Sequence, residues 1–265
     1  MNGLLRRTLA AAGWTGLGLI AVIVVLSDFL ARAPAGAAHV GAVLASPSSI
    51  FPFGTDLLGR DMLSETLHAL NATVVSTVPA SAVAIATGGV FGFVAARFST
   101  PMRLPIRWAA GVLAAIPALL LAILLIGLTT RGYAVLAAGL AASPLAFVRA
   151  FDRARKSANS AHSEYARATG MAPSALLRRD LAYEVRDTLL STAARALAAV
   201  TIILSTVSFL GFGAVPPHRD LGLMIAAAKP VYVQAWWTAA FPALALLIMI
   251  LFARLAAGLE EGERA

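Results

Sequence analysis

Two short polar segments carry the residue types from which a binding or docking site could be built. The first runs from Gly54 to Asp61 and reads Gly-Thr-Asp-Leu-Leu-Gly-Arg-Asp. Its glycines permit turns, Asp56 can cap one of these turns, and the guanidinium of Arg60 can pair with either aspartate. This pattern predicts a structured loop in which backbone and charges are held in fixed positions.

The second segment, Glu164-Tyr165-Ala166-Arg167-Ala168-Thr169-Gly170, has the pattern of a short helix that ends at a glycine. Alanine and arginine favour helix, and Gly170 can end it in the left-handed conformation. Pro173 suits the first turn of a second helix. Glu164 and Arg167 lie three residues apart and can pair on one face. The segment therefore predicts a compact helical knob whose small alanines let a partner surface approach closely.

Other kinds of chemistry find little support in the sequence. The chain contains no Gly-x-x-x-x-Gly-Lys-Ser/Thr phosphate loop, so it is not expected to hydrolyse ATP itself. It contains no cysteine, and its four histidines lack the paired spacing of metal ligands: His39, His68, His162 and His218. No nucleophile, base and acid form a convincing set, and we therefore predict neither a catalytic residue nor a metal site.

The composition indicates which elements must position these segments. Apolar residues make up 59% of the 265 residues and charged residues 13%, whereas a soluble domain carries about a quarter charged residues. The apolar residues fall in long runs, and each run must satisfy its own backbone as a helix because lipid offers no hydrogen bonds. The net charge of +8 lies in loops between these runs, so it indicates membrane orientation and not nucleic-acid binding.

Six apolar runs predict an all-α integral membrane protein with about six transmembrane helices. They cover roughly residues 13–31, 72–96, 108–128, 133–148, 188–212 and 236–253. The first run could instead be a signal peptide, because Arg6 and Arg7 precede it and Ala31-Arg32-Ala33 offers a cleavage site. The fourth run is short and is interrupted by Ser143-Pro144. Trp236 and Trp237 suit the interfacial belt at the start of the sixth run.

The distribution of Lys and Arg predicts the orientation of the chain. With the N-terminus in the cytoplasm, the inner segments hold fifteen Lys and Arg residues and the outer segments hold five: Arg32, Arg60, Arg131, Arg219 and Lys229. The positive-inside rule then makes both termini and the segment 151–187 cytoplasmic. We expect an N-terminal helix and outer loop over residues 1–71 and a core transmembrane domain over 72–265. Arg195 lies inside the fifth run and is expected to snorkel.

The segment Gly54–Asp61 closely resembles the Gly-Thr-Asp-x-x-Gly-Arg-Asp signature of the permease family of dipeptide, oligopeptide and nickel importers. The matching positions are Gly54, Thr55, Asp56, Gly59, Arg60 and Asp61. A later stretch, Ser208-Phe209-Leu210-Gly211-Phe212-Gly213 followed by Pro216-Pro217, resembles the family's Ser-Phe-Leu-Gly-x-Gly-x-x-Pro-Pro segment. The chain departs from the family at Leu221 and Leu223, where relatives usually have Trp and Asn.

The segment Glu164–Gly170 resembles the EAA loop of ABC importer permeases, in which Glu-Ala-Ala is followed by three residues and a glycine. Glu164, Ala166 and Gly170 match, and Tyr165 stands where the first alanine is expected. The second half of the family pattern is lost at Asp180, Ala182 and Tyr183. Because this loop inserts into a groove of the ATPase in the family, the resemblance implies an ATPase-docking role for Glu164, Tyr165, Ala166, Arg167, Ala168 and Gly170.

By these resemblances the chain is identified as a member of the ABC importer permeases with the type I fold. The resemblance implies a transmembrane subunit of an ATP-driven importer in the bacterial inner membrane. Its partners would be a second homologous permease, two ATPase subunits and an extracytoplasmic solute-binding protein. ATP and Mg would bind to the ATPase subunits, and this chain would hold no cofactor. The family carries peptides, nickel and metal chelates, and the short chain slightly favours a nickel-type or metallophore-type member.

Two other functions stay open on the sequence alone. A secondary transporter driven by an ion gradient usually needs carboxylates near the middle of the membrane, and no apolar run holds a central Asp or Glu. A membrane enzyme would need a convergent catalytic set, which the runs do not offer. Transport without an ATPase partner would favour the first alternative, and activity of the purified chain alone would favour the second.

Overall fold

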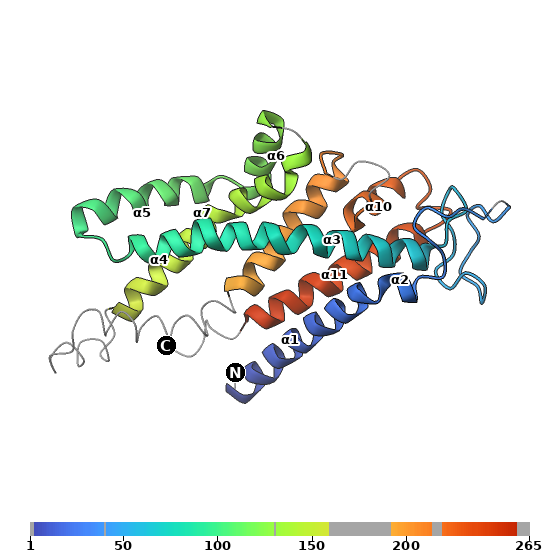
Figure 1. The fold of residues 1–265 in the computed structure, drawn as a ribbon, viewed down its shortest axis with the longest axis horizontal. Coiled ribbons are helices and arrows are strands. Elements are labelled where there is room, and N and C mark those ends of the chain that lie inside the picture. The colour runs from blue at the N-terminus through green and yellow to red at the C-terminus, as the bar shows by residue number, and fades with distance from the viewer. Residues whose placement is uncertain (1–2, 40, 130, 159–191, 214–218, 259–265) are drawn as a thin grey trace.

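The long helices of the structure lie side by side in an elongated bundle (Figure 1). The computed structural model describes residues 3–39, 41–129, 131–158, 192–213 and 219–258. Within these ranges it contains helices and two isolated β-bridges, Ala38–Arg60 and Thr55–Asp61, but no strand. The expectation of an all-α fold is therefore confirmed for the described residues.

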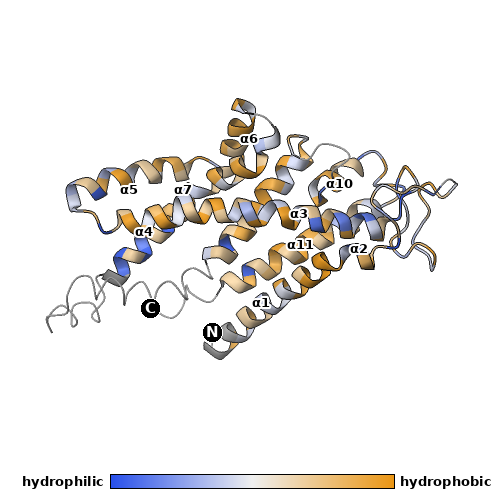
Figure 2. Ribbon diagram, viewed as in Figure 1, coloured by the Kyte–Doolittle hydropathy of each residue, from blue (hydrophilic) through white to orange (hydrophobic). Residues whose placement is uncertain are grey.

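The elements keep the labels of Figure 1. In chain order they are α1 (Gly3–Val25), α2 (Ser27–Leu30), α3 (Met62–Ala84), the π-helix η1 (Ile85–Val90), α4 (Phe91–Ala95), α5 (Thr100–Ala115), α6 (Ala118–Leu128), the 3-10 helix η2 (Arg131–Tyr133), α7 (Ala134–Ala158), α10 (Leu221–Ala227) and α11 (Trp237–Ala257). The helix Thr192–Phe209 lies between α7 and α10 in the chain. Figure 2 shows that apolar residues cover the long helices, while polar residues gather mainly at their ends and in the loops.

Among the described residues, five helices are long and apolar enough to cross a membrane, and the bent pair α5 and α6 raises the number to six. This agrees with the six apolar runs of the sequence. The five are Thr8–Val25, Met62–Ala95, Ala134–Lys156, Thr192–Phe209 and Trp237–Ala257. The fourth run does not end at Val148 as expected, because α7 includes Pro144 and continues to Ala158.

The second span is much longer than the apolar run that predicted it. α3 begins at Met62, ahead of Ala72, because the Asp61 carboxylate caps it and accepts a hydrogen bond from the Ser64 N–H at 3.1 Å. Together with η1 and α4 it continues to Ala95, so that its 34 residues span about 50 Å. This length exceeds the ~30 Å of a hydrocarbon core, and we expect the polar first turns of α3 to extend beyond the lipid.

The third apolar run does not form the single helix that the sequence predicts. α5 ends at Ala115, α6 begins at Ala118, and their axes meet at 89°. Ile116, which precedes Pro117, has an extended backbone with ψ of 128°. Proline disfavours the helical conformation in the residue before it, so the chain turns sharply here. We name this turn the α5–α6 elbow.

Glycines bring the second span and α7 into close contact. A Cβ on Gly139 of α7 would lie 2.5 Å from the carbonyl oxygen of Ala80 in α3. Farther along, a Cβ on Gly88 of η1 would overlap the α7 backbone at Ser143. Small residues at such a crossing let two helices in lipid approach until their backbones touch. We name this contact the α3–α7 crossing.

α1 lies along α11, and both of these helices are joined to the rest of the bundle by hydrogen bonds. Asn71 of α3 donates hydrogen bonds to the Val24 carbonyl oxygen at 3.2 Å and to the Ser27 hydroxyl at 3.0 Å. Arg195 donates from Nη2 to the Ala257 carbonyl oxygen at 3.1 Å. The Arg195 guanidinium therefore lies at the end of α11, near the start of its own helix, where the expected snorkelling would take it.

Candidate functional site

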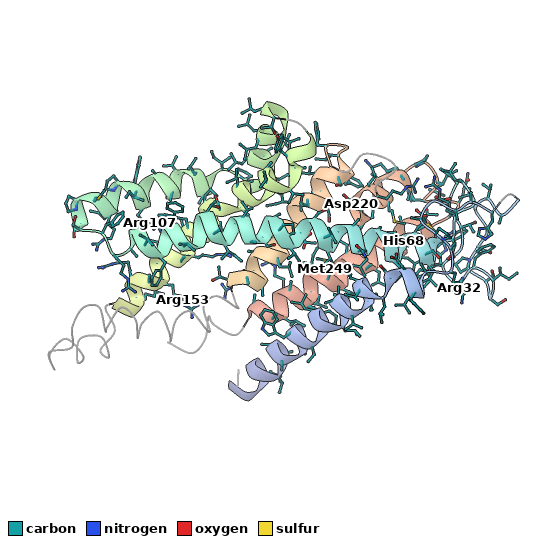
Figure 3. The ribbon with its side chains drawn as sticks, viewed as in Figure 1. Arg32, His68, Arg107, Arg153, Asp220 and Met249 are labelled. Carbon is teal, nitrogen blue, oxygen red and sulfur yellow. The ribbon has the colours of Figure 1, made fainter. Side chains whose placement is uncertain are left out.

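The residues that the sequence singled out belong to opposite ends of the bundle. We name the end that carries residues 32–61 and 219–236 the loop end, and the opposite end, where α1 begins and α11 ends, the terminal end. Figure 3 shows His68 and Asp220 toward the loop end and Arg107 and Arg153 toward the terminal end. The predicted docking residues Glu164–Gly170 lie outside the described residues, and α7, which ends at Ala158, is the described helix that precedes them.

The segment Gly54–Asp61 forms the tight turn that its sequence predicts. The Oδ1 atom of Asp56 accepts hydrogen bonds from the N–H of Leu58 at 2.8 Å and from the N–H of Arg60 at 2.9 Å. Gly59 has a φ of 72°, and a Cβ there would lie 2.5 Å from the His39 carbonyl oxygen. The aspartate and the glycine therefore fix the turn in the way expected of these residue types.

Thr55 and Trp237 join this turn to the start of α11. Thr55 is fully buried, and its hydroxyl accepts a hydrogen bond from the Ala45 N–H at 2.8 Å. Its carbonyl oxygen accepts a hydrogen bond from Nε1 of Trp237 at 3.0 Å. Gly54 leaves room for this contact, since a Cβ there would lie 2.6 Å from the indole nitrogen. Trp237 is accordingly 7% exposed and faces the protein, whereas its neighbour Trp236 is 57% exposed; the interfacial position of both stays a prediction.

Asp61 ends the turn and begins α3. Its Oδ2 atom accepts a hydrogen bond from the Ser64 hydroxyl at 2.6 Å, in addition to the bond from the Ser64 N–H. The Ser64 oxygen in turn accepts from the backbone N–H groups of Arg32 at 2.9 Å and Ala33 at 3.2 Å. The start of α3 is thereby bonded to the chain that follows α2.

Glu65 is the centre of a charge network at the loop end. It is 4% exposed, and its Oε1 atom accepts a hydrogen bond from the Gly36 N–H at 2.6 Å. Its Oε2 atom lies 4.0 Å from Nη1 of Arg60 and 3.7 Å from Nη1 of Arg219. The same Arg219 nitrogen lies 3.6 Å from Oδ2 of Asp56. Arg219 therefore connects the chain before α10 to both the turn and α3.

This network differs from the pairing expected from the sequence. The sequence allowed Arg60 to pair with either aspartate, but the Asp56 carboxylate bonds to its own turn and the Asp61 carboxylate to α3. Arg60 reaches Glu65 instead. The position of Glu65, in the first turn after a helix cap, is a local signal that could have identified it. Arg219 carries no such signal, because its partners lie far away in the chain.

Asp220 begins α10, and the first turn of this helix is bonded to two other helices. Its Oδ1 atom accepts a hydrogen bond from the Leu223 N–H at 2.8 Å, and its Oδ2 atom accepts one from the Ser208 hydroxyl. The N–H of Leu221 donates to the Thr73 hydroxyl of α3 at 3.1 Å. Side-chain hydroxyls on α3 and on the preceding helix therefore hold the first turn of α10.

The surroundings of Asp220 oppose its ionisation. Burial raises the pKa of this carboxyl above its ordinary value of 3.8, and hydrogen bonds from Ser208, Leu223 and Gly222 lower it in part. The net effect is a raised pKa, so the folded protein holds a proton here more readily than the unfolded chain does. The attachment of α10 therefore includes a group whose charge responds to pH.

The loop end assembles polar groups without assembling a reaction centre. Its carboxylates accept hydrogen bonds from backbone N–H groups or face arginines, which fixes their positions. In the part of the chain that the structure describes, no group of three or more His, Cys, Asp or Glu side chains could hold a metal ion. The arrangement binds the loop to α3 and α11 and fixes its conformation.

The terminal end is held differently. Four small or aromatic side chains form an apolar cluster between α4 and the end of α7: Ala95, Ala96, Phe151 and Ala154. Next to this cluster, the Arg107 guanidinium of α5 pairs with the Asp152 carboxylate of α7 at 3.0 Å. No sequence pattern singled out this pair, because its members lie 45 residues apart, in the polar segments on either side of the third and fourth apolar runs.

Several known proteins are similar to this chain over most of its length. Residues 88–260 match the family described as binding-protein-dependent transport system inner membrane component. A putative peptide transport system permease protein of Brucella suis is 27% identical over 253 residues, which cover 94% of this chain and 84% of the relative. A di/tripeptide transport system permease protein of Pseudomonas aeruginosa is 27% identical over 207 residues, covering 76% and 67%. A peptide transport system permease protein of Escherichia coli is 26% identical over 254 residues, covering 93% and 86%.

Proposed function

The chain belongs to the family of binding-protein-dependent transport system inner membrane components, and we propose that it is a permease subunit of an ATP-driven peptide importer. It is a multi-pass protein of the bacterial inner membrane, and its family and relatives are transport components and not enzymes. The observation that carries the proposal is the similarity of nearly the whole chain, 94% of it, to a protein named for peptide transport.

Peptides are the solute class that the relatives favour. The three relatives described above are named for peptide or di/tripeptide transport. We therefore propose peptides in preference to the nickel and metal chelates that the sequence left open. The slight preference for a nickel-type member came from chain length alone, and similarity over most of the chain is the stronger argument.

In this proposal the loop end faces outward and both termini face the cytoplasm, as the distribution of Lys and Arg favours. A solute-binding protein would deliver peptide to the loop end. The turn Gly54–Asp61 would serve there as a rigid platform and not as a solute ligand. The support is that Asp56, Arg60 and Glu65 are already engaged with one another, with backbone groups or with Arg219.

ATP would act at the other end of the bundle. We propose that ATPase subunits, which bind ATP and Mg, dock at Glu164–Gly170, and that a second homologous permease completes the pathway. The support is the resemblance of this segment to the EAA loop and its place in the chain directly after α7. Movement of the docked ATPases would then reach the bundle through α7 as a rigid-body switch.

A substitution at the proposed docking segment tests its role. Gly170→Leu should abolish ATP-dependent uptake while membrane insertion stays normal, because a side chain would block close approach of the ATPase. The matched control is Gly18→Leu, since nothing lies within 4 Å of a Cβ at Gly18. Uptake and complex assembly are measured together for both variants. Wild-type uptake by Gly170→Leu would contradict the docking role.

The whole proposal is tested by reconstitution. The chain is purified with its partner permease, ATPases and binding protein and placed in proteoliposomes. Uptake of radiolabelled di- and tripeptides should require the binding protein and ATP, and ADP should not support it. Uptake of radioactive nickel and not of peptide would show that the proposed solute class is wrong. Uptake driven by an ion gradient without nucleotide would favour the secondary transporter instead.

A further inference from the structure

α5 is attached to the bundle by few packing contacts. None of its residues is buried, and the half-buried positions lie on one helical face: Arg103, Ile106, Arg107, Ala110, Gly111 and Ala114. This face lies against α7. Most of these side chains are small or polar, so apolar packing alone holds α5 weakly.

A bidentate ion pair supplements this packing. Nε of Arg107 lies 3.0 Å from Oδ1 of Asp152, and Nη2 of Arg107 lies 3.0 Å from Oδ2. Two parallel hydrogen bonds of this kind fix the orientation of both groups as well as their distance. The guanidinium also lies 5.8 Å from the centre of the Phe151 ring. A Cβ on Gly111 would lie 3.2 Å from Nη1, so the glycine leaves space for the arginine.

The charges around the pair favour this partner for Asp152. Residues 97–107 and 149–156 contain seven cationic residues, which are Arg97, Arg103, Arg107, Arg149, Arg153, Arg155 and Lys156. Asp152 is the one acidic residue in these two segments. The structure turns it toward α5, and the pair therefore joins two elements that the elbow would otherwise leave free to separate.

α5, α6 and α7 form a triangle, and the ion pair lies at one of its corners. α6 packs against the first half of α7 through Ala122 and Ile126, and the start of α5 lies against its second half near Phe151. The α5–α6 elbow at Pro117 forms another corner (Figure 1). Because the elbow lacks continuous helical hydrogen bonds, the contacts of α5 and α6 with α7 must set its angle.

From this geometry we propose that Arg107 and Asp152 are positioning residues for transport: they lock α5 to the end of α7 that leads into the docking segment. The inference rests on the proposed function. When docked ATPases move the end of α7, the ion pair carries α5 with it, and the elbow passes the movement to α6. Neither residue touches the transported solute in this mechanism.

The exposure of the pair separates this role from a role in stability. The Arg107 and Asp152 side chains are 32% and 50% exposed. Ion pairs with this degree of exposure contribute little to the free energy of unfolding. The two hydrogen bonds of the pair nevertheless fix the position of α5 relative to α7. Substitution should therefore disturb the transmission of movement more than the folding of the chain.

The first test compares charge removal with charge exchange in the reconstituted complex. Arg107→Gln and Asp152→Asn should each lower the amount of peptide moved per ATP hydrolysed by about fivefold, the factor that an exposed ion pair can supply at most. Arg107→Asp combined with Asp152→Arg should restore most of this ratio. The control is Arg103→Gln, one turn away on α5, where the Arg103 side chain donates a hydrogen bond to Thr100 of the same helix.

Three results would overturn the proposal. The first is an unchanged ratio in both single variants. The second is an exchanged pair that behaves no better than the single variants. The third is failure of all pair variants to assemble while Arg103→Gln assembles normally, which would make the pair a folding contact and not a positioning one.

The second test needs no transport assay. Because the chain lacks cysteine, spin labels can be placed at Leu104→Cys on α5 and Lys156→Cys on α7 without removing any native thiol. The distribution of distances between the labels should be narrow in the parent and clearly broader after Arg107→Gln. An unchanged width would overturn the proposal. If the parent complex shows no ATP-dependent uptake, the proposed function fails, whereas the width still reports whether the pair locks α5 to α7.

Discussion

The loop end and the terminal end are held together by different interactions. At the loop end, buried side chains bind backbone groups from distant segments, as Thr55 binds Ala45 and Glu65 binds Gly36. At the terminal end, within the described residues, an exposed ion pair and a small apolar cluster join α4, α5 and α7. Buried bonds to backbone groups allow few alternative geometries, so the loop end is specified rigidly, whereas the exposed pair and the small cluster let α4, α5 and α7 move together as a unit.

This difference suits the roles proposed for the two ends, which are contact with the binding protein at the loop end and response to the ATPases at the terminal end. A surface that receives a binding protein must keep its shape, and buried hydrogen bonds to the backbone achieve this because leaving them unmade is costly. An end that follows docked ATPases must move without unfolding, which small and exposed contacts permit. Substitutions made in matched pairs, one at each end, test the contrast directly.

Removal of a carboxylate at the loop end should give the largest loss of stability. Glu65→Ala takes the partner from Arg219 and from the Gly36 N–H, and loss of one member of a buried ion pair costs about 3 kcal/mol. The matched Asp152→Ala removes a side chain that is 50% exposed, which should cost less than about 1 kcal/mol. The decrease in Tm of each purified variant in detergent, relative to the wild type, measures both losses of stability. Equal decreases in Tm would show that the ends do not differ.

Addition of a methyl group at a loop-end glycine should give the second largest loss of stability. Gly54 has a φ of 71°, which costs alanine about 1–2 kcal/mol, and the methyl group would also press on Trp237. The matched Gly111→Ala faces only the flexible end of Arg107 and gains about 1 kcal/mol in helix propensity. Tm should fall for the first variant and stay level or rise for the second. The opposite order would contradict a rigid loop end.

Loss of an indole N–H should have a smaller effect. Trp237→Phe leaves the buried Thr55 carbonyl oxygen without its hydrogen bond, at a cost of about 1 kcal/mol. Trp108 on α5 is 76% exposed, and Trp108→Phe should leave Tm unchanged. Hydrogen exchange should rise in residues 42–56 for Trp237→Phe alone. Unchanged protection there would mean that the indole does not fasten the turn.

The pH dependence of α10 should show the smallest effect. The pKa of Asp220 is raised above 3.8 in the folded protein, so the folded state binds more protons than the unfolded state just above that pH. Its contribution to the free energy of unfolding therefore falls as the pH rises from 3.8 through the folded pKa. Asn at this position can still cap α10 and cannot titrate.

Asp220→Asn should accordingly gain stability relative to the wild type as the pH rises over that interval. Tm values measured from pH 4 to pH 7 for both proteins give the difference. A difference that is constant with pH would mean that Asp220 does not titrate in this range.

The sequence alone predicted those features that are encoded within a few neighbouring residues. The number of spans followed from long apolar runs, because lipid leaves the backbone no alternative to helix. The turn from Gly54 to Asp61 followed from the residue types, and the hydrogen bonds of Asp56 to Leu58 and Arg60 confirm it. In both cases the physical cause is local.

Features that depend on distant contacts or on the edge of the lipid could not be predicted in the same way. The Trp237 indole and the Thr55 carbonyl lie 182 residues apart in the sequence, and no local pattern predicts their contact. A count of apolar residues could not locate the start of α3 at Met62, because a helix can continue beyond its apolar run into water. The elbow at Pro117 was missed because no polar residue interrupts the sequence from Trp108 to Leu128.

The run from Met62 to Ala95 resembles a beam that is clamped along one part of its length. α7 contacts it at Ala80, Gly88 and Gly92 and packs against Ala95, which leaves about 27 Å of helix between Met62 and Ala80 beyond this contact. A rotation of the clamped part displaces the projecting part more, the farther it lies from α7. A small rotation where α4 meets α7 would therefore arrive at Asp61 and its attached turn as a larger displacement.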